Sequence, residues 1–226
     1  MTSYAQTERR ALADALLAAG PEAPTLCEGW TAADLAAHLV IRENRPDAAV
    51  GIMFKPTARW TERVQDGYRD RRPYAALVER FRSGPPVWSP ARAAKLDELM
   101  NMIEYFVHHE DLLRGGDKDL PEGRVPDPPR VLDRDFEAQL WHRLRSSAKL
   151  MFRRAPVGVT LVRTSADKAL PRATVVAKAA TPQMVTVAGS AGELILFAFG
   201  RTGAARVELT GEDSAVAQLR GAKLGI

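Results

Sequence analysis

The sequence predicts an α+β protein, with a helical part over residues 1–153 and a smaller mixed part over residues 154–226. Up to Arg153, apolar residues recur at steps of three and four, which is the period of amphipathic helices. After Pro156 the pattern changes to an alternation of apolar with small or polar residues, which is typical of strands. The C-terminal part is small for a domain that folds around its own hydrophobic core, so we expect it to pack against the helical part.

Composition and charge limit the classes of function. Hydrophobic residues make up 46% of the chain and charged residues 27%, which is typical of a globular protein. The formal net charge is +4, but acidic residues are interleaved with the basic ones and no nucleic-acid motif accompanies the excess. A solvated basic surface is therefore favoured over nucleic-acid binding.

The apolar runs and the first residues of the chain predict no membrane partner. No uninterrupted apolar run approaches the ~20 residues of a membrane span, and the first residues lack a signal-peptide pattern. The single cysteine, Cys27, excludes an internal disulfide framework. We expect a cytoplasmic protein that acts on small molecules.

The first two predicted helices have clear boundaries. Residues 6–19 carry spaced leucines and are followed by a Gly-Pro pair that ends the pattern. Thr31 and Asp34 have the spacing of a capping box, and Trp30 stands where a hydrophobic staple would. The second helix is therefore expected to begin near Thr31 and to end at Pro46.

The middle of the chain contains the longest predicted helix. A polar helix is expected over residues 56–72, and a short one after Pro73. The central helix covers residues 92–114 and ends at a Gly-Gly pair. A proline-rich connector follows over residues 117–130, and a further helix is expected over residues 133–153. The apolar stripe of the central helix comprises Leu96, Leu99, Ile103, Phe106, Val107 and Leu113.

The C-terminal part is expected to mix strands and helices. Ser190 and Glu193 have the spacing of a second capping box, which opens an apolar helix over residues 194–199. A closing helix is expected over residues 214–219. The expected strands cover residues 157–161, 173–178, 184–188 and 206–210.

Two predicted helices carry residues suited to a metal site. Glu104 and His108 are four residues apart and lie one turn apart on the same helical face, and Asp111 continues that line. His38 lies beside the inward stripe of the second helix. Burying a carboxylate and an imidazole beside a core is costly unless a partner pairs with them.

A divalent metal on His38, Glu104 and His108 would be such a partner. Two imidazoles and one carboxylate are the ligands of catalytic zinc sites, which keep one position open for water or substrate. Open non-haem iron sites use the same ligand types, so the spacing leaves the metal undetermined.

Three ordered motifs resemble one protein family. They are C-E-G-W-T-A-A-D-L-A-A-H-L-V-I-R-E-N-R-P-D (residues 27–47), E-Y-F-V-H-H-E-D-L-L-R (residues 104–114) and E-L-I-L-F-A-F-G-R (residues 193–201). Together they are similar to an actinobacterial, metal-binding branch of the DinB-like superfamily that is related to mycothiol-dependent maleylpyruvate isomerase. The resemblance covers nearly the whole chain.

The resemblance implies both a fold and a chemistry. The implied fold is a DinB-like four-helix bundle over residues 1–153 and a small α/β, sterol-carrier-like domain over residues 154–226. The family's metal ligands fall on His38, Glu104 and His108. The implied activity is that of a metal- and thiol-dependent isomerase or transferase, with zinc, nickel or iron as the metal and mycothiol as co-substrate. The habit of the superfamily also suggests a homodimer.

The two arginines that follow His38 have two open interpretations. Arg42 and Arg45 lie one and two turns beyond the histidine, where they would receive an anionic substrate or the carboxylate of a thiol. The alternative is that they are surface residues at a helix end, where cations are stabilised by the helix dipole.

The roles of three further residues near the predicted site are also open. Asp111 either orients His108 as a second-shell partner or is a solvated or helix-pairing carboxylate. Cys27 is interpreted as a small buried loop residue, with a thiolate ligand or a redox residue as the alternatives. His109 points about 100° away from His108 on the helix and is expected to pack or to form a hydrogen bond.

A rival to the enzyme is a non-catalytic metal-binding module, in which the metal stabilises the bundle or senses a ligand. A fourth protein ligand, such as Cys27 or His109, would favour this rival because closed zinc sites are structural. A third hypothesis is a metal-free bundle whose C-terminal domain carries an apolar ligand beside residues 194–199.

Overall fold

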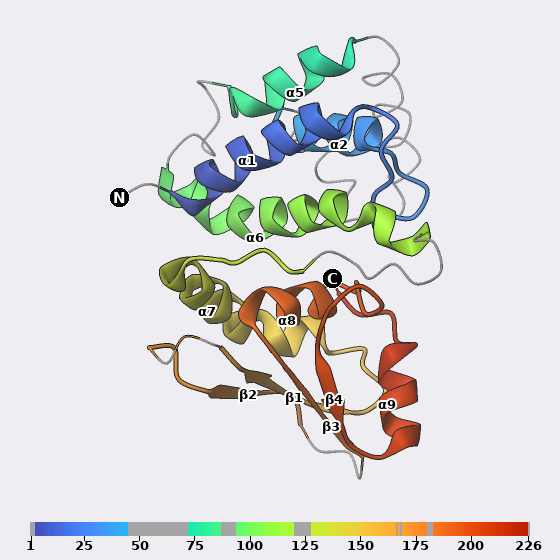
Figure 1. Cartoon of the computed structure of the whole chain (residues 1–226). Coiled ribbons are helices and arrows are strands. Elements are labelled where there is room, and N and C mark those ends of the chain that lie inside the picture. Colours follow the sequence, from blue (N-terminus) through green and yellow to red (C-terminus); the bar gives the residue numbers. More distant parts are fainter. Residues whose placement is uncertain are drawn as a thin grey trace. The chain divides into compact units, whose positions relative to one another are not determined.

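The computed structural model describes residues 3–44, 72–86, 94–119, 128–165, 167, 169–179 and 183–225. The chain divides into two compact units, Met1–Asp127 and Pro128–Ile226. Among the described residues, the first unit is helical and the second contains a four-stranded sheet with helices (Figure 1). The predicted α+β class is therefore confirmed.

Helix packing forms the core of the first unit. Helix α1 contacts α6, α5 and α2, and α2 also contacts α5. Each helix buries an apolar stripe against its neighbours, as the three- and four-residue spacing predicts. The described α-helices are α1 (Tyr4–Ala19), α2 (Ala32–Asn44), α5 (Tyr74–Arg82) and α6 (Ala94–Leu113), and the short 3-10 helix η3 (Gly115–Asp119) follows α6. Side chains of this core include Leu12, Leu16, Leu35, Leu39, Leu77, Phe81 and Phe106.

Side-chain caps explain where α2 begins. Oγ1 of Thr31 accepts a hydrogen bond from the backbone N–H of Asp34 at 3.4 Å, and Oδ2 of Asp34 accepts one from the N–H of Thr31 at 2.9 Å. These are the reciprocal bonds of a capping box, which satisfy two N–H groups that a helix start leaves without partners. The predicted beginning of the second helix is confirmed. Its predicted end at Pro46, and residues 56–71 of the next predicted helix, lie outside the described residues.

The stripe predicted for α6 is wrong at Leu113, while the side chains of Leu96 and Leu99 lie outside the described part of the chain. Leu113 is 48% exposed, whereas Phe106 and Val107 are buried. The reason is that a loop covers another side of the helix end. Asp111 and Gly115, which contact that loop, lie about 200° around the helix from Leu113.

The second unit is built on a mixed sheet with the strand order β2-β1-β3-β4. Strand β1 is antiparallel to β2 and parallel to β3, and β3 is antiparallel to β4. All four strands fall within a few residues of their predicted positions, because the alternation of apolar and polar residues follows the pleat. They are β1 (Gly158–Arg163), β2 (Ala173–Lys178), β3 (Met184–Gly189) and β4 (Glu208–Thr210).

Helices supply the other half of this second core. Helix α8 (Ala191–Ala198) is buried along its whole length and contacts β1, β3 and α7 (Arg134–Met151). The chain closes with α9 (Asp213–Arg220), which contacts β3. Apolar side chains of β1 and β3 that face this layer are Val159, Leu161, Val185 and Val187.

The division between the units precedes α7, whereas the sequence places it after Arg153. Helix α7 packs on α8 and β2 of its own unit. Its buried face includes Phe136, Leu140 and Leu144, while Leu150 is 47% exposed. The apolar residues of α7 have the same helical spacing as those of the preceding helices. This spacing alone does not show which of the two cores the helix packs into.

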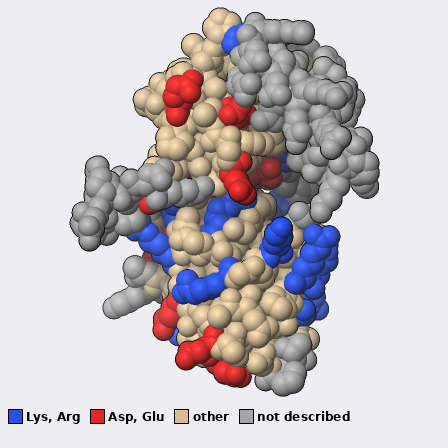
Figure 2. Space-filling view, turned by 90° about the vertical axis from the view of Figure 1, so that its right-hand side faces the viewer, with Lys and Arg blue, Asp and Glu red and all other residues tan. Residues whose placement is uncertain are grey.

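The described surface carries both signs of charge. Basic and acidic side chains both lie on the face shown in Figure 2, as the interleaved sequence leads one to expect. None of the described helices is long and apolar enough to span a membrane.

Candidate metal centre

Side chains from α2 and α6 meet in the first unit. His38, Glu104 and His108 each offer a ligand atom, and these atoms all lie within 4.8 Å of one another. Nε2 of His108 is 3.6 Å from Oε1 of Glu104, and the centroids of the two imidazole rings are 5.1 Å apart. The structure thus brings together the three residues that the sequence predicts as metal ligands.

The spacing of these atoms fits a small divalent ion. Zinc binds nitrogen and carboxylate oxygen at about 2.0–2.2 Å, so a tetrahedral site needs about 3.3–3.5 Å between neighbouring ligand atoms. The 3.6 Å between Nε2 of His108 and Oε1 of Glu104 is close to this separation. An ion between them would require only small movements of these two side chains.

His38 supplies the most specific sign of a ligand. Its side chain is 6% exposed, and its Nε2 has no hydrogen-bond partner within the described part of the chain. A buried polar atom left without a partner costs about 1–3 kcal/mol. A cation bound by Nε2 would remove that cost. The ring of Trp30, predicted only as a helix staple, lies 5.0 Å from the His38 ring and helps to enclose it.

The pKa values of the three groups follow from burial and from their mutual contacts. Burial, together with the nearby His108, lowers the pKa of His38 to about 3. Burial alone would raise the pKa of Glu104, but the hydrogen bond to His108 and the charge of Arg42 lower it to about 2. Glu104 is therefore a carboxylate and His38 a neutral imidazole at neutral pH, which are the protonation states that metal ligands require.

His108 lies between acidic groups on both sides of its ring. Burial would lower its pKa, but its hydrogen bonds with Asp111, Cys27 and Glu104 outweigh burial and raise the pKa well above 6.5. The surroundings of this ring therefore favour positive charge. A cation bound here would be stabilised by the same carboxylates.

Arg42 lies beside this group of ligands. Its Nε is 3.6 Å from Oε1 of Glu104, and its guanidinium also donates to Oδ1 of Asn101. The arginine thus faces the site rather than only the helix end. Arg45 lies outside the described residues.

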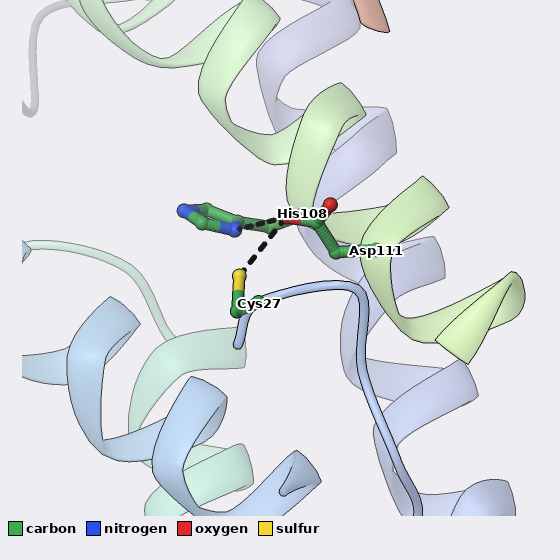
Figure 3. Close-up of side chains that lie close together, drawn as sticks. All are labelled: Cys27, His108 and Asp111. Carbon is green, nitrogen blue, oxygen red and sulfur yellow. Dashed lines mark hydrogen bonds and ion pairs between the residues drawn. The ribbon is translucent and has the colours of Figure 1, made fainter. Parts of the chain in front are cut away.

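Asp111 and Cys27 contact the opposite side of His108 (Figure 3). Oδ2 of Asp111 lies 3.0 Å from Nδ1 of His108, as expected for a carboxylate that orients a metal-binding imidazole. The same oxygen accepts a hydrogen bond from Sγ of Cys27 at 3.2 Å. Cys27 is half-buried in its loop, and the sequence offered no spacing that would link it to Asp111.

The loop that carries Cys27 is fixed to the end of α6. The N–H of Leu26 donates to the carbonyl of Asp111 at 2.9 Å. Gly115 allows the closest approach, because a Cβ atom there would lie 1.9 Å from the carbonyl oxygen of Pro24. Residue 115 must therefore be glycine for the loop to reach Asp111.

His109 belongs to a different set of contacts. Its Nδ1 lies 3.2 Å from Oε2 of Glu8 on α1, which agrees with the predicted packing or hydrogen-bonding role. Nearby, the buried Arg9 lies 3.1 Å from Oε1 of Glu43 and donates to the hydroxyl of Tyr105 at 2.9 Å. Sequence reasoning missed this buried network, because its members are far apart in the chain and none stands in a recognisable motif.

In comparisons with protein-family models, with curated proteins and with solved structures, nothing was found that matches this chain.

Proposed function

We propose that this chain binds a divalent metal, zinc in the first place, through His38, Glu104 and His108 and uses it with a low-molecular-weight thiol. The observation that carries the proposal is the buried Nε2 of His38, which has no partner among the described residues, in a side chain that is grouped with a carboxylate and a second imidazole. Nickel and iron suit the same ligand types.

The proposed reaction is a thiol-dependent isomerisation or transfer. Three protein ligands leave one position on the metal open. A bound metal would lower the pKa of a thiol there, so that the thiol would be a nucleophilic thiolate at neutral pH. The motifs that resemble mycothiol-dependent maleylpyruvate isomerase support mycothiol as that thiol. A DinB-like bundle, a sterol-carrier-like second domain and a homodimer belong to the same proposal.

The chain's own residues have distinct roles in this proposal. Asp111, 3.0 Å from Nδ1 of His108, holds that ring so that Nε2 faces Glu104. Arg42, 3.6 Å from Glu104, is placed to attract the carboxylate of a substrate or thiol. It also stabilises the ionised form of Glu104.

The rival hypothesis of a non-catalytic module would gain from a fourth protein ligand. Among the described residues, neither Cys27 nor His109 belongs to the group that contains His38. His109 pairs with Glu8, and Cys27 contacts Asp111 on the Nδ1 side of His108. The three-ligand group therefore favours an open, catalytic position.

The test uses cobalt in the Cys27→Ser variant, in which an added thiol is the only source of a thiolate ligand because the chain has a single cysteine. Cobalt should give a visible spectrum that His38→Ala abolishes. Adding mycothiol should then produce thiolate-to-cobalt charge-transfer absorption. Cobalt binding with no spectral response to mycothiol or to other small thiols would refute thiol activation. Turnover of maleylpyruvate by the zinc-loaded wild-type protein would identify the isomerase reaction.

A further inference from the structure

A second group of ligating side chains lies on the other side of His108. Cys27, Asp111 and His108 offer a sulfur, an oxygen and a nitrogen atom that all lie within 4.8 Å of one another. Figure 3 shows Cys27 reaching this group from its loop, while the other two residues come from α6. Asp111 contacts Nδ1 of His108, whereas Glu104 contacts Nε2 of the same ring. This second group therefore lies on the side of the ring opposite to Glu104.

The separations in this group are close to those of a coordination shell. For a zinc-sized tetrahedral ion, bonds of about 2.3 Å to sulfur and 2.0–2.2 Å to nitrogen and oxygen require separations of about 3.4–3.6 Å. The observed separations are 3.2 Å from Sγ to Oδ2 and 3.0 Å from Nδ1 to Oδ2. Each pair must open by only about 0.4 Å to admit such an ion.

The backbone holds these side chains together independently of any ion. The hydrogen bond from Leu26 to the carbonyl of Asp111 joins the residue before Cys27 to one of the other ligands. The contact between Gly115 and Pro24 fixes the same loop one turn further along. A preformed set of ligands on tethered elements loses less entropy when it binds an ion than a flexible one does.

We infer that Cys27, Asp111 and Nδ1 of His108 form a second cation site, which takes thiophilic ions such as zinc and cadmium. Only this second group contains a thiolate, so cadmium, whose bond to a thiolate absorbs in the ultraviolet, distinguishes it from the imidazoles and carboxylate of the first group. The inference goes beyond the proposed function and shares with it the ring of His108 and the carboxylate of Asp111, which orients that ring there and is a ligand here.

Proton balance makes the two positions competitive. On binding, Cys27 releases its thiol proton to solvent and ligates as the thiolate. A neutral imidazole has one proton and one lone pair. A positively charged His108 must release its Nδ1 proton to solvent before Nδ1 ligates, and the remaining proton resides on Nε2, 3.6 Å from Oε1 of Glu104. The same ring cannot then ligate through Nε2, so one ion excludes the other.

The test is a titration of the metal-free full chain with cadmium, followed by ultraviolet thiolate-to-cadmium charge-transfer absorption. This absorption reports Cys27 alone, because the chain has no other cysteine. The His38→Ala variant removes a ligand of the first group only, so it should give the same absorption and affinity as the wild type. In Cys27→Ser the absorption should vanish, and in Asp111→Asn the affinity should fall by roughly tenfold or more.

The controls distinguish a site with several protein ligands from cadmium binding by the Cys27 thiol without other ligands. Asp117→Asn removes a nearby carboxylate outside the group and should leave the affinity unchanged. Circular dichroism should show that Cys27→Ser and Asp111→Asn remain folded. An affinity of Asp111→Asn equal to that of the wild type, or no charge-transfer absorption in the wild type, would overturn the inference.

Zinc and cadmium binding together distinguish failure of this inference from failure of the proposed function. Zinc that is bound through His38, together with no cadmium–thiolate absorption, overturns this inference and leaves the proposed function standing. Cadmium–thiolate absorption that depends on Asp111, in a protein whose zinc binding is unchanged by His38→Ala, supports this inference and removes the proposed function.

Discussion

Gly115→Ala gives the sharpest test of how the site is assembled. The added Cβ would lie 1.9 Å from the carbonyl oxygen of Pro24 and 2.6 Å from Cα of Thr25. Both neighbours are backbone atoms, so no side-chain rotation can relieve the contact. The loop that carries Cys27 must move away from the end of α6.

The expected loss of stability follows from this clash. Overpacking a tight contact costs about 1–3 kcal/mol, and displacement of a hydrogen-bonded loop places this case near the upper end. For a chain of this size, ~2–3 kcal/mol corresponds to a decrease in Tm of about 4–12 °C. The movement should also lengthen the contact between Cys27 and Asp111, and so weaken cadmium binding.

Gly116→Ala is the matched control. A Cβ at this adjacent position meets nothing within 4 Å, and the residue is exposed. Its stability should change by less than about 1 kcal/mol, since only the entropy of the unfolded chain is altered. Thermal unfolding followed by circular dichroism measures both variants. Equal Tm values for Gly115→Ala and Gly116→Ala would refute the proposed role of the close approach.

Two further predictions concern the rest of the first unit. Glu43→Ala removes the carboxylate 3.1 Å from the buried guanidinium of Arg9 and should cost about 3–5 kcal/mol in urea unfolding. Asp14→Ala breaks a surface ion pair and should cost less than about 1 kcal/mol; similar losses in the two variants would contradict the difference in burial. Burial raises the pKa of Tyr74 to about 12, so the folded chain holds the phenolic proton more tightly than the unfolded chain, whose pKa is about 10. This stabilisation is complete below pH 10 and is lost as the pH rises towards 12. The Tyr74→Phe variant should not lose this part of its stability at alkaline pH. Parallel curves of stability against pH for the two proteins would refute this prediction.

Local patterns predicted most of the secondary structure because their causes are local. The capping box of Thr31 and Asp34 and the four-residue step from Glu104 to His108 depend on neighbours within one turn. These patterns were enough to place a carboxylate and an imidazole on one helical face. The pairing of His38 with that face depends on how two helices pack. Its place beside the inward stripe of the second helix made it a candidate ligand, and the family resemblance pointed to the same residue.

Long-range contacts account for what the sequence did not reveal. The approach of Cys27 to Asp111 joins residues 84 positions apart and depends on the missing side chain of Gly115. The burial of Arg9 with Glu43 likewise joins α1 to α2. The membership of α7 in the second unit depends on the helix and strand that it contacts, which its own period does not encode.

We propose above all that His38, Glu104 and His108 hold a metal. Elemental mass spectrometry of protein purified without chelators or an affinity tag tests it most directly, with His38→Ala as the perturbation and the exposed His142→Ala as the matched control. We expect near-stoichiometric metal in the wild type and in His142→Ala, and its loss in His38→Ala. A wild-type protein that carries no metal and takes up no added zinc, nickel or iron would contradict it, as would full metal content in His38→Ala.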